Sequence, residues 1–136
     1  MVFPSGTKIV TLGDSHTEGG SNGGTSTTYR SNNSIIGWAL QEVHGLDYAI
    51  WYDSTRSPTF SGSNFGKGGD SATMLLERLP SAIRSAKKMD AKIAVLLIGT
   101  NTGTTDTAFR MKRTRIRTIV NELVDSGLTV VLGTIF

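Results

Sequence analysis

The sequence predicts one α/β domain in which helices cover both faces of a mostly parallel sheet, a three-layer α/β/α sandwich. Segments with strand character alternate with segments whose apolar residues recur at helical spacing. Residues 91–98 form a nearly continuous apolar run, as expected for a strand buried on both faces of a parallel sheet. The 136 residues suit a single domain, 1–136, and show no internal repeat.

The amino-terminal half is predicted to hold two strands, one helix and two polar segments. Residues 8–12 and 48–52 have strand character, and residues 35–43 have apolar positions at helical spacing. Residues 19–28 are too rich in Gly, Ser and Thr to build a core, so they form a loop that is either a surface linker or a lid that contacts substrate. Residues 54–63 are polar and contain the strand breaker Pro58.

The carboxyl-terminal half continues the alternation. Residues 71–88 predict a helix that Pro80 kinks or divides. After the strand at residues 91–98, residues 106–126 predict a long helix and residues 128–135 the last strand. An apolar strand in last place leaves a sheet edge that is normally paired or covered. We therefore expect the domain to be incomplete at its carboxyl end, with another chain or segment completing the sheet.

Composition excludes several classes of function. The chain has no cysteine, which removes disulfides, thiolate catalysis and thiolate metal sites. No His, Asp and Glu cluster has metal-ligand spacing, and residues 66–69 lack the ending of a phosphate-binding P-loop, so we expect neither a metal nor a cofactor. We find no secretory signal and no membrane span; a cytoplasmic or virion-associated location is the most compatible, and the compartment is not determined.

A basic cluster lies within the predicted helix at residues 106–126. Apolar residues are interleaved with it at helical spacing, and aromatic stacking residues are not. With a formal net charge of only +3, this pattern indicates the solvated face of an amphipathic helix and no nucleic-acid partner. The cluster comprises Arg110, Lys112, Arg113, Arg115 and Arg117.

The candidate nucleophile follows the first predicted strand, in Gly13-Asp14-Ser15-His16-Thr17. A serine between the end of a strand and the start of a helix exposes its hydroxyl at the carboxyl edge of the sheet. A hydroxyl is a weak nucleophile at neutral pH, so hydrolysis also needs a base and donors for the oxyanion.

Two later segments carry small or amide residues at strand and helix boundaries, where they can meet Ser15. They are residues 64–71, Asn-Phe-Gly-Lys-Gly-Gly-Asp-Ser, and residues 98–101, Ile-Gly-Thr-Asn. Taken singly, each is explained by a tight turn. The three blocks in this order resemble the SGNH (GDSL-type) hydrolase family, and the resemblance runs from about residue 8 onward. The second Gly of the Gly-x-Ser-x-Gly elbow is replaced by Thr17, so the α/β-hydrolase fold loses support.

The resemblance implies a flavodoxin-like sheet and assigns roles to particular residues. Three oxyanion donors are implied: the backbone N–H groups of Ser15 and Gly69 and the side-chain amide of Asn101. Asp14 and Asn64 are expected to support the site, Asp14 by orienting loops through its carboxylate. Glycine suits close approach of a backbone N–H, and an amide donates without charge.

Two departures from the family pattern concern the machinery around these donors. Thr102 stands where the family has Asp after the asparagine. The family's general base is a His in an Asp-x-x-His motif beyond the last predicted strand, and this chain has none there. His16 follows Ser15 directly, and adjacent side chains diverge at a helix start, so we expect it to line the cleft. His44 precedes Gly45 and suits a helix carboxyl terminus.

The sequence therefore predicts a serine ester hydrolase acting through an acyl-enzyme on Ser15. The resemblance implies short acyl esters, acetylated sugars or lipids as substrates. Two alternatives remain open. One is a binding or structural module that keeps the fold without a complete dyad, within a larger assembly. The other is a flavodoxin-like ligand-binding domain, whose glycine loops would have to grip phosphate.

Overall fold

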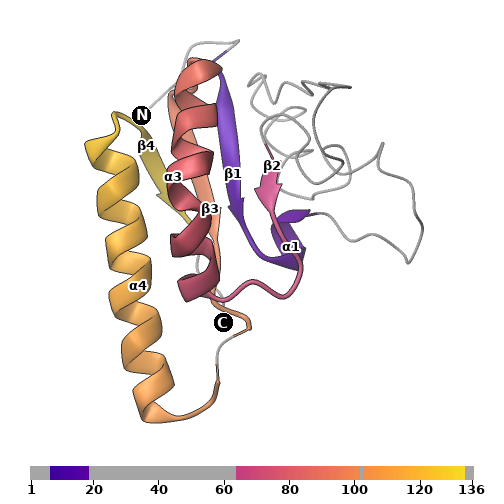
Figure 1. The fold of residues 1–136 in the computed structure, drawn as a ribbon, viewed down its shortest axis with the longest axis vertical. Helices are drawn as coiled ribbons and strands as arrows, with labels where there is room; N and C mark the ends of the chain where they lie inside the picture. Colours follow the sequence, from indigo (N-terminus) through magenta and orange to yellow (C-terminus); the bar gives the residue numbers. More distant parts are fainter. Residues whose placement is uncertain (1–6, 19–63, 102, 134–136) are drawn as a thin grey trace, which may run out of the picture.

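The computed structural model describes residues 7–18, 64–101 and 103–133, which build a parallel sheet with strand order β2-β1-β3-β4 (Figure 1). The strands are β1 (Ile9–Gly13), β2 (Asn64–Gly66), β3 (Ile93–Leu97) and β4 (Thr129–Leu132). The helices are α1 (Ser15–Glu18), α3 (Ala72–Lys88) and α4 (Asp106–Asp125). None of these described helices is long and apolar enough to cross a membrane.

The strand register brings the three sequence blocks to one edge of the sheet. In β1, Thr11 pairs with Asn64 of β2 on one side and with Val95 of β3 on the other. Because all four strands run in parallel, their carboxyl ends lie at the same edge. The segments that follow β1, β2 and β3 therefore meet there, below the strands in Figure 1.

Helices α3 and α4 pack side by side on one face of the sheet (Figure 1). Ser71 caps α3 by accepting from the Met74 N–H, and Thr105 caps α4 by accepting from the Ala108 N–H. The core beneath them is built from buried aliphatic and small residues of the sheet and both helices. It includes Val10, Leu12, Leu75, Leu79, Ala94, Leu96, Ile119 and Leu123.

The prediction that Pro80 divides the helix is wrong, because α3 runs unbroken from Ala72 to Lys88. Pro80 itself is exposed, while Leu75 and Ala86, on either side of it along the helix, are buried in the same core. Packing on both sides of the proline therefore offsets the backbone hydrogen bond that it removes.

The prediction of a parallel α/β fold is confirmed, with shifted strand boundaries. The first strand ends at Gly13, one residue later than predicted, and the last strand, Thr129–Leu132, is shorter than the predicted 128–135. Sequence reasoning missed β2, whose three residues include Asn64 and Gly66 and give little strand signal. The predictions for residues 19–28, 35–43, 48–52 and 54–63 lie outside the described residues.

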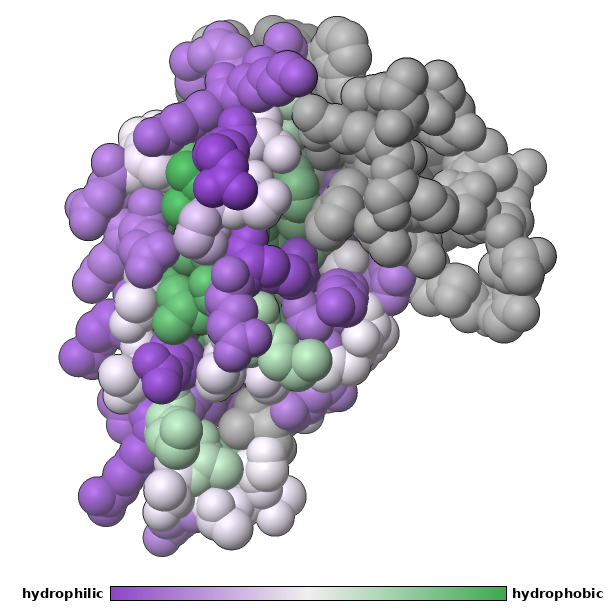
Figure 2. Space-filling view, viewed as in Figure 1, coloured by the Kyte–Doolittle hydropathy of each residue, from purple (hydrophilic) through white to green (hydrophobic). Residues whose placement is uncertain are grey.

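The long predicted helix is present as α4 and is amphipathic. Its buried residues are Ile119 and Leu123, and its exposed side in Figure 2 is mainly hydrophilic. Lys112 is half-buried: its Nζ donates to the Gly99 carbonyl at 3.4 Å and lies 4.9 Å from the centre of the Phe109 ring. These observations agree with a solvated helix face.

Candidate active site

The candidate nucleophile sits in a tight turn between β1 and α1. The carbonyl oxygen of Asp14 accepts from the N–H groups of Thr17 at 3.1 Å and Glu18 at 2.9 Å, which forms the first helical turn and leaves Ser15 exposed. A Cβ on Gly13 would lie 2.1 Å from both the Leu97 carbonyl and the Thr17 hydroxyl. Only glycine allows the strand to end this close to β3.

Asp14 is buried beneath this turn. Its Oδ1 accepts from the backbone N–H of His16 at 3.1 Å and lies 3.1 Å from the His16 Nδ1. Its Oδ2 is buried with no hydrogen-bond partner among the described residues. The carboxylate thus faces the helix start and holds it, which is the geometry expected of a residue that orients the turn.

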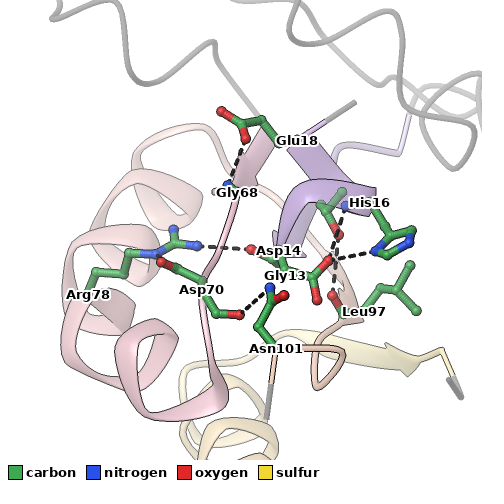
Figure 3. A network of polar contacts seen from close by, with 10 residues as sticks. Gly13, Asp14, His16, Glu18, Gly68, Asp70, Arg78, Leu97 and Asn101 are labelled. Atoms are coloured by element: carbon green, nitrogen blue, oxygen red, sulfur yellow. Dashed lines mark hydrogen bonds and ion pairs between the residues drawn. The ribbon is translucent and has the colours of Figure 1, made fainter. Parts of the chain in front are cut away.

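The His16 imidazole and the Ser15 side chain have different neighbours. A Cβ on Gly68 would lie 3.9 Å from the Ser15 Cβ, which places the serine next to the loop after β2. Figure 3 shows the His16 ring across α1 from Gly68, against Asp14. The side chain is 60% exposed. This arrangement does not bring the imidazole toward the hydroxyl as a base.

The second block is tied to α1 by side-chain hydrogen bonds. Asn64 Nδ2 donates to the Thr17 carbonyl at 2.9 Å, and its Oδ1 accepts from the Gly66 N–H at 2.8 Å. The Gly68 N–H donates to Oε2 of Glu18 at 2.7 Å. A Cβ on Gly66 would lie 2.2 Å from the Glu18 nitrogen, so β2 and α1 are too close here for any side chain. Asn64 therefore joins the two blocks directly.

Gly69 and Asn101 bring donors to the same edge. Gly69 is exposed, with φ +80, and its N–H has no acceptor among the described residues. Asn101 is also exposed, and its Nδ2 donates one hydrogen to the Asp70 carbonyl at 3.1 Å, which leaves the second hydrogen available (Figure 3). The residue after it, Thr102, lies outside the described residues.

The arrangement is suited to stabilising a developing negative charge. The backbone N–H of Ser15, like that of Gly69, finds no acceptor in the described part of the chain. Within the described ranges, three uncharged donors thus have no acceptor and lie at the same sheet edge as the exposed Ser15, and an oxyanion hole requires donors of this kind. The described residues contain no group of His, Cys, Asp or Glu able to hold a metal ion.

Sequence reasoning missed Arg78, which reaches this edge from α3. Its Nε donates to Asp70 Oδ2 and its Nη2 to the Gly13 carbonyl at 3.1 Å. No spacing signal pointed to this contact, because Asp70 precedes the cap Ser71 and so lies outside α3.

A model of a known family matches most of the chain. A profile of the GDSL-like lipase/acylhydrolase family matches residues 9–127, which include all three sequence blocks. Among curated proteins, none matches the chain in sequence.

Solved structures of similar fold include three hydrolases. One is a GDSL-like lipase from Bacteroides thetaiotaomicron, which is 15% identical with a TM-score of 0.56. The match covers 93% of this chain and 47% of the lipase. An SGNH-hydrolase family esterase is 21% identical with a TM-score of 0.61, and 96% of this chain covers 59% of it. A catalytic mutant of an acetylxylan esterase from Geobacillus stearothermophilus is 17% identical with a TM-score of 0.60. That match covers 97% of this chain and 61% of the esterase. The chain thus spans about half to three-fifths of these structures.

Proposed function

Because the chain belongs to the GDSL-like lipase/acylhydrolase family, we propose that it carries the nucleophile and the oxyanion hole of a serine ester hydrolase. The single observation that carries the proposal is that the exposed Ser15 shares one sheet edge with three donors that have no acceptor among the described residues, its own N–H, the Gly69 N–H and one Asn101 side-chain hydrogen. All three residues are exposed, so a substrate can reach these donors. Donors left open at one edge of a sheet are suited to a bound oxyanion.

In the proposed reaction, Ser15 Oγ attacks the ester carbonyl carbon and its proton passes to a base. The carbonyl oxygen becomes an oxyanion held by the three donors. Collapse of this intermediate breaks the bond to the alcohol, which leaves with a proton from the base, and an acyl-enzyme remains on Ser15. Water then attacks the acyl group while the same donors hold the second oxyanion, and collapse of this intermediate releases the acid.

We assign the base to a histidine outside the described residues, on another segment or another chain. Two observations support this. The His16 imidazole is held against Asp14, away from the loop that borders Ser15. The structures of similar fold also extend well beyond the part that this chain covers. For the substrate we propose a short acyl ester, an acetylated sugar or a lipid; one structure of similar fold is an acetylxylan esterase.

The alternative is a binding or structural module that keeps the site without turnover. The observation that favours it is the absence, in the described part of the chain, of a histidine facing Ser15. Such a module would present an oxyanion hole that binds a carbonyl or carboxylate and does not cleave an ester.

Labelling with a fluorophosphonate tests the proposal in protein supplied with the segment or chain that carries the base, because the probe phosphonylates only an activated serine. We expect the adduct on Ser15, identified by mass spectrometry of tryptic peptides. It should disappear in Ser15→Ala and persist in Ser81→Ala, which removes an exposed serine of α3. A folded protein with no adduct on Ser15 would favour the binding module, and an adduct that survives Ser15→Ala would contradict the assignment of the nucleophile.

A further inference from the structure

Beside the candidate site lies a buried ion pair that the proposed chemistry does not use. Arg78 of α3 donates from Nε to Oδ2 of Asp70, and the two side chains are only 17% and 1% exposed. The other carboxylate oxygen, Asp70 Oδ1, is buried without a partner among the described residues. A buried ion pair adds little net stability compared with apolar residues of the same size. The contribution of this pair therefore lies in what it holds in place.

The same guanidinium also holds the end of β1. Its Nη2 donates to the carbonyl oxygen of Gly13 at 3.1 Å, and that oxygen accepts as well from the Lys67 N–H at 3.0 Å. Gly13 stands two residues before Ser15, in a turn whose close contacts leave it little freedom. A shift of this carbonyl would therefore move the serine with it.

Asp70 carries the connection to the other two blocks. Its backbone carbonyl accepts the Asn101 side-chain hydrogen at 3.1 Å, and the residue before it is Gly69. The position of Asp70 thus determines where the Gly69 N–H lies and how the Asn101 amide is oriented. Figure 3 shows the continuous series of contacts from Gly13 through Arg78 and Asp70 to Asn101.

We propose that Arg78 is a positioning residue that sets the spacing between the Ser15 nucleophile and the Gly69 and Asn101 donors. The proposal rests on the proposed function of this site. Arginine suits the role because its Nε and Nη2 lie in one rigid plane and reach two acceptors together. Lysine carries the same charge on a single nitrogen and cannot reproduce this fork.

The test is the rate of fluorophosphonate labelling at saturation, kinact, together with the half-saturating probe concentration, KI, both measured with the base-carrying segment or chain supplied. In Arg78→Met we expect kinact to fall about 100-fold, because displacing reacting groups by about 1 Å costs that much. Arg78→Lys should lose less, and KI should change little in either variant, since neither contacts the probe. The matched control is Arg84→Met, on the exposed side of the same helix, with kinact unchanged.

A destabilised core variant separates positioning from stability. Leu123→Ala removes a buried side chain of α4 far along the chain from the three blocks, so it should lower the melting temperature and leave kinact unchanged. If the Arg78 variants lose melting temperature while keeping the wild-type kinact, the proposal is overturned. If Arg78→Met does not fold, Arg78→Lys decides in the same way. A wild-type chain that is never labelled at Ser15 would instead overturn the proposed function, and this inference with it.

Discussion

The two outer strands of the described sheet have opposite surroundings. All three residues of β2 are buried, and Asn64 and Gly66 are bound to α1 by hydrogen bonds and close contacts. In β4, by contrast, Val131 is 46% and Leu132 48% exposed, and β3 is the only strand paired with it in the described sheet. Both strands are short and parallel to their neighbours, so the difference arises from what packs around them.

This contrast separates two tasks of the fold. On the β2 side, many polar groups of the turns bind one another, and the proposed oxyanion donors are among those that have no partner in the described part of the chain. On the β4 side, the apolar side chains and one edge of the strand lie open, as expected where a further strand or chain would pack. The contrast agrees with the proposal that Ser15 and its donors lie on the β2 side and that the base lies outside the described residues.

The largest expected effect is a loss of stability when the close packing of β2 against α1 is disrupted. Gly66→Ala places a Cβ 2.2 Å from the backbone nitrogen of Glu18, which cannot move without moving α1. We expect a loss of about 3 kcal/mol or more in the free energy of unfolding, at the upper end for overpacking. Chemical denaturation with urea measures it.

The matched control lies at the other outer strand. Gly133→Ala, directly after β4, places a Cβ 2.9 Å from Cδ1 of Leu97, the far end of a flexible side chain. That contact relaxes by rotation, so we expect a change of about 1 kcal/mol or less. Equal losses at both positions would show that the β2 side is no more tightly packed than the β4 side.

The next effect concerns the donors that the β2 side leaves open. Asn101→Ala should lower the labelling rate of Ser15 about 100-fold, the usual cost of one oxyanion donor, and Asn101→Asp should lower it at least as much because a carboxylate repels the developing charge. Both changes are on an exposed side chain, so the melting temperature should change little. An Asn101→Ala protein that is labelled at the wild-type rate would remove this residue from the oxyanion hole.

The smallest effect on stability is expected from a substitution in β4. The property measured there is self-association of the chain. Val131→Lys puts a charge on the open edge, which discourages pairing between copies of the chain. Sedimentation velocity should show less self-association than for the wild type, with stability nearly unchanged. Asn121→Lys, which adds the same charge on exposed α4, controls for net charge. Equal association of the wild type and Val131→Lys would mean that β4 is not the contact.

The parallel fold and the meeting of the three blocks were predictable from the sequence, and the couplings among them were not. Continuous apolar runs such as residues 91–98 reveal buried strands, and parallel strands place their following turns at one edge. β2 was missed because three residues are too few to show periodicity. The roles of Arg78 and of the Asp14–His16 contact depend on distances between side chains, which spacing in sequence does not determine.

The central claim is that this chain carries the serine and its oxyanion donors while the base comes from outside the described residues. The most direct test is turnover of p-nitrophenyl acetate by this chain, with the rate of Ser15→Ala subtracted. We predict a feeble Ser15-dependent rate, about a thousandfold over water, because oxyanion binding persists when the base is missing. Full Ser15-dependent turnover by this chain alone would contradict the claim and would identify an internal base, with His16 the first residue to substitute.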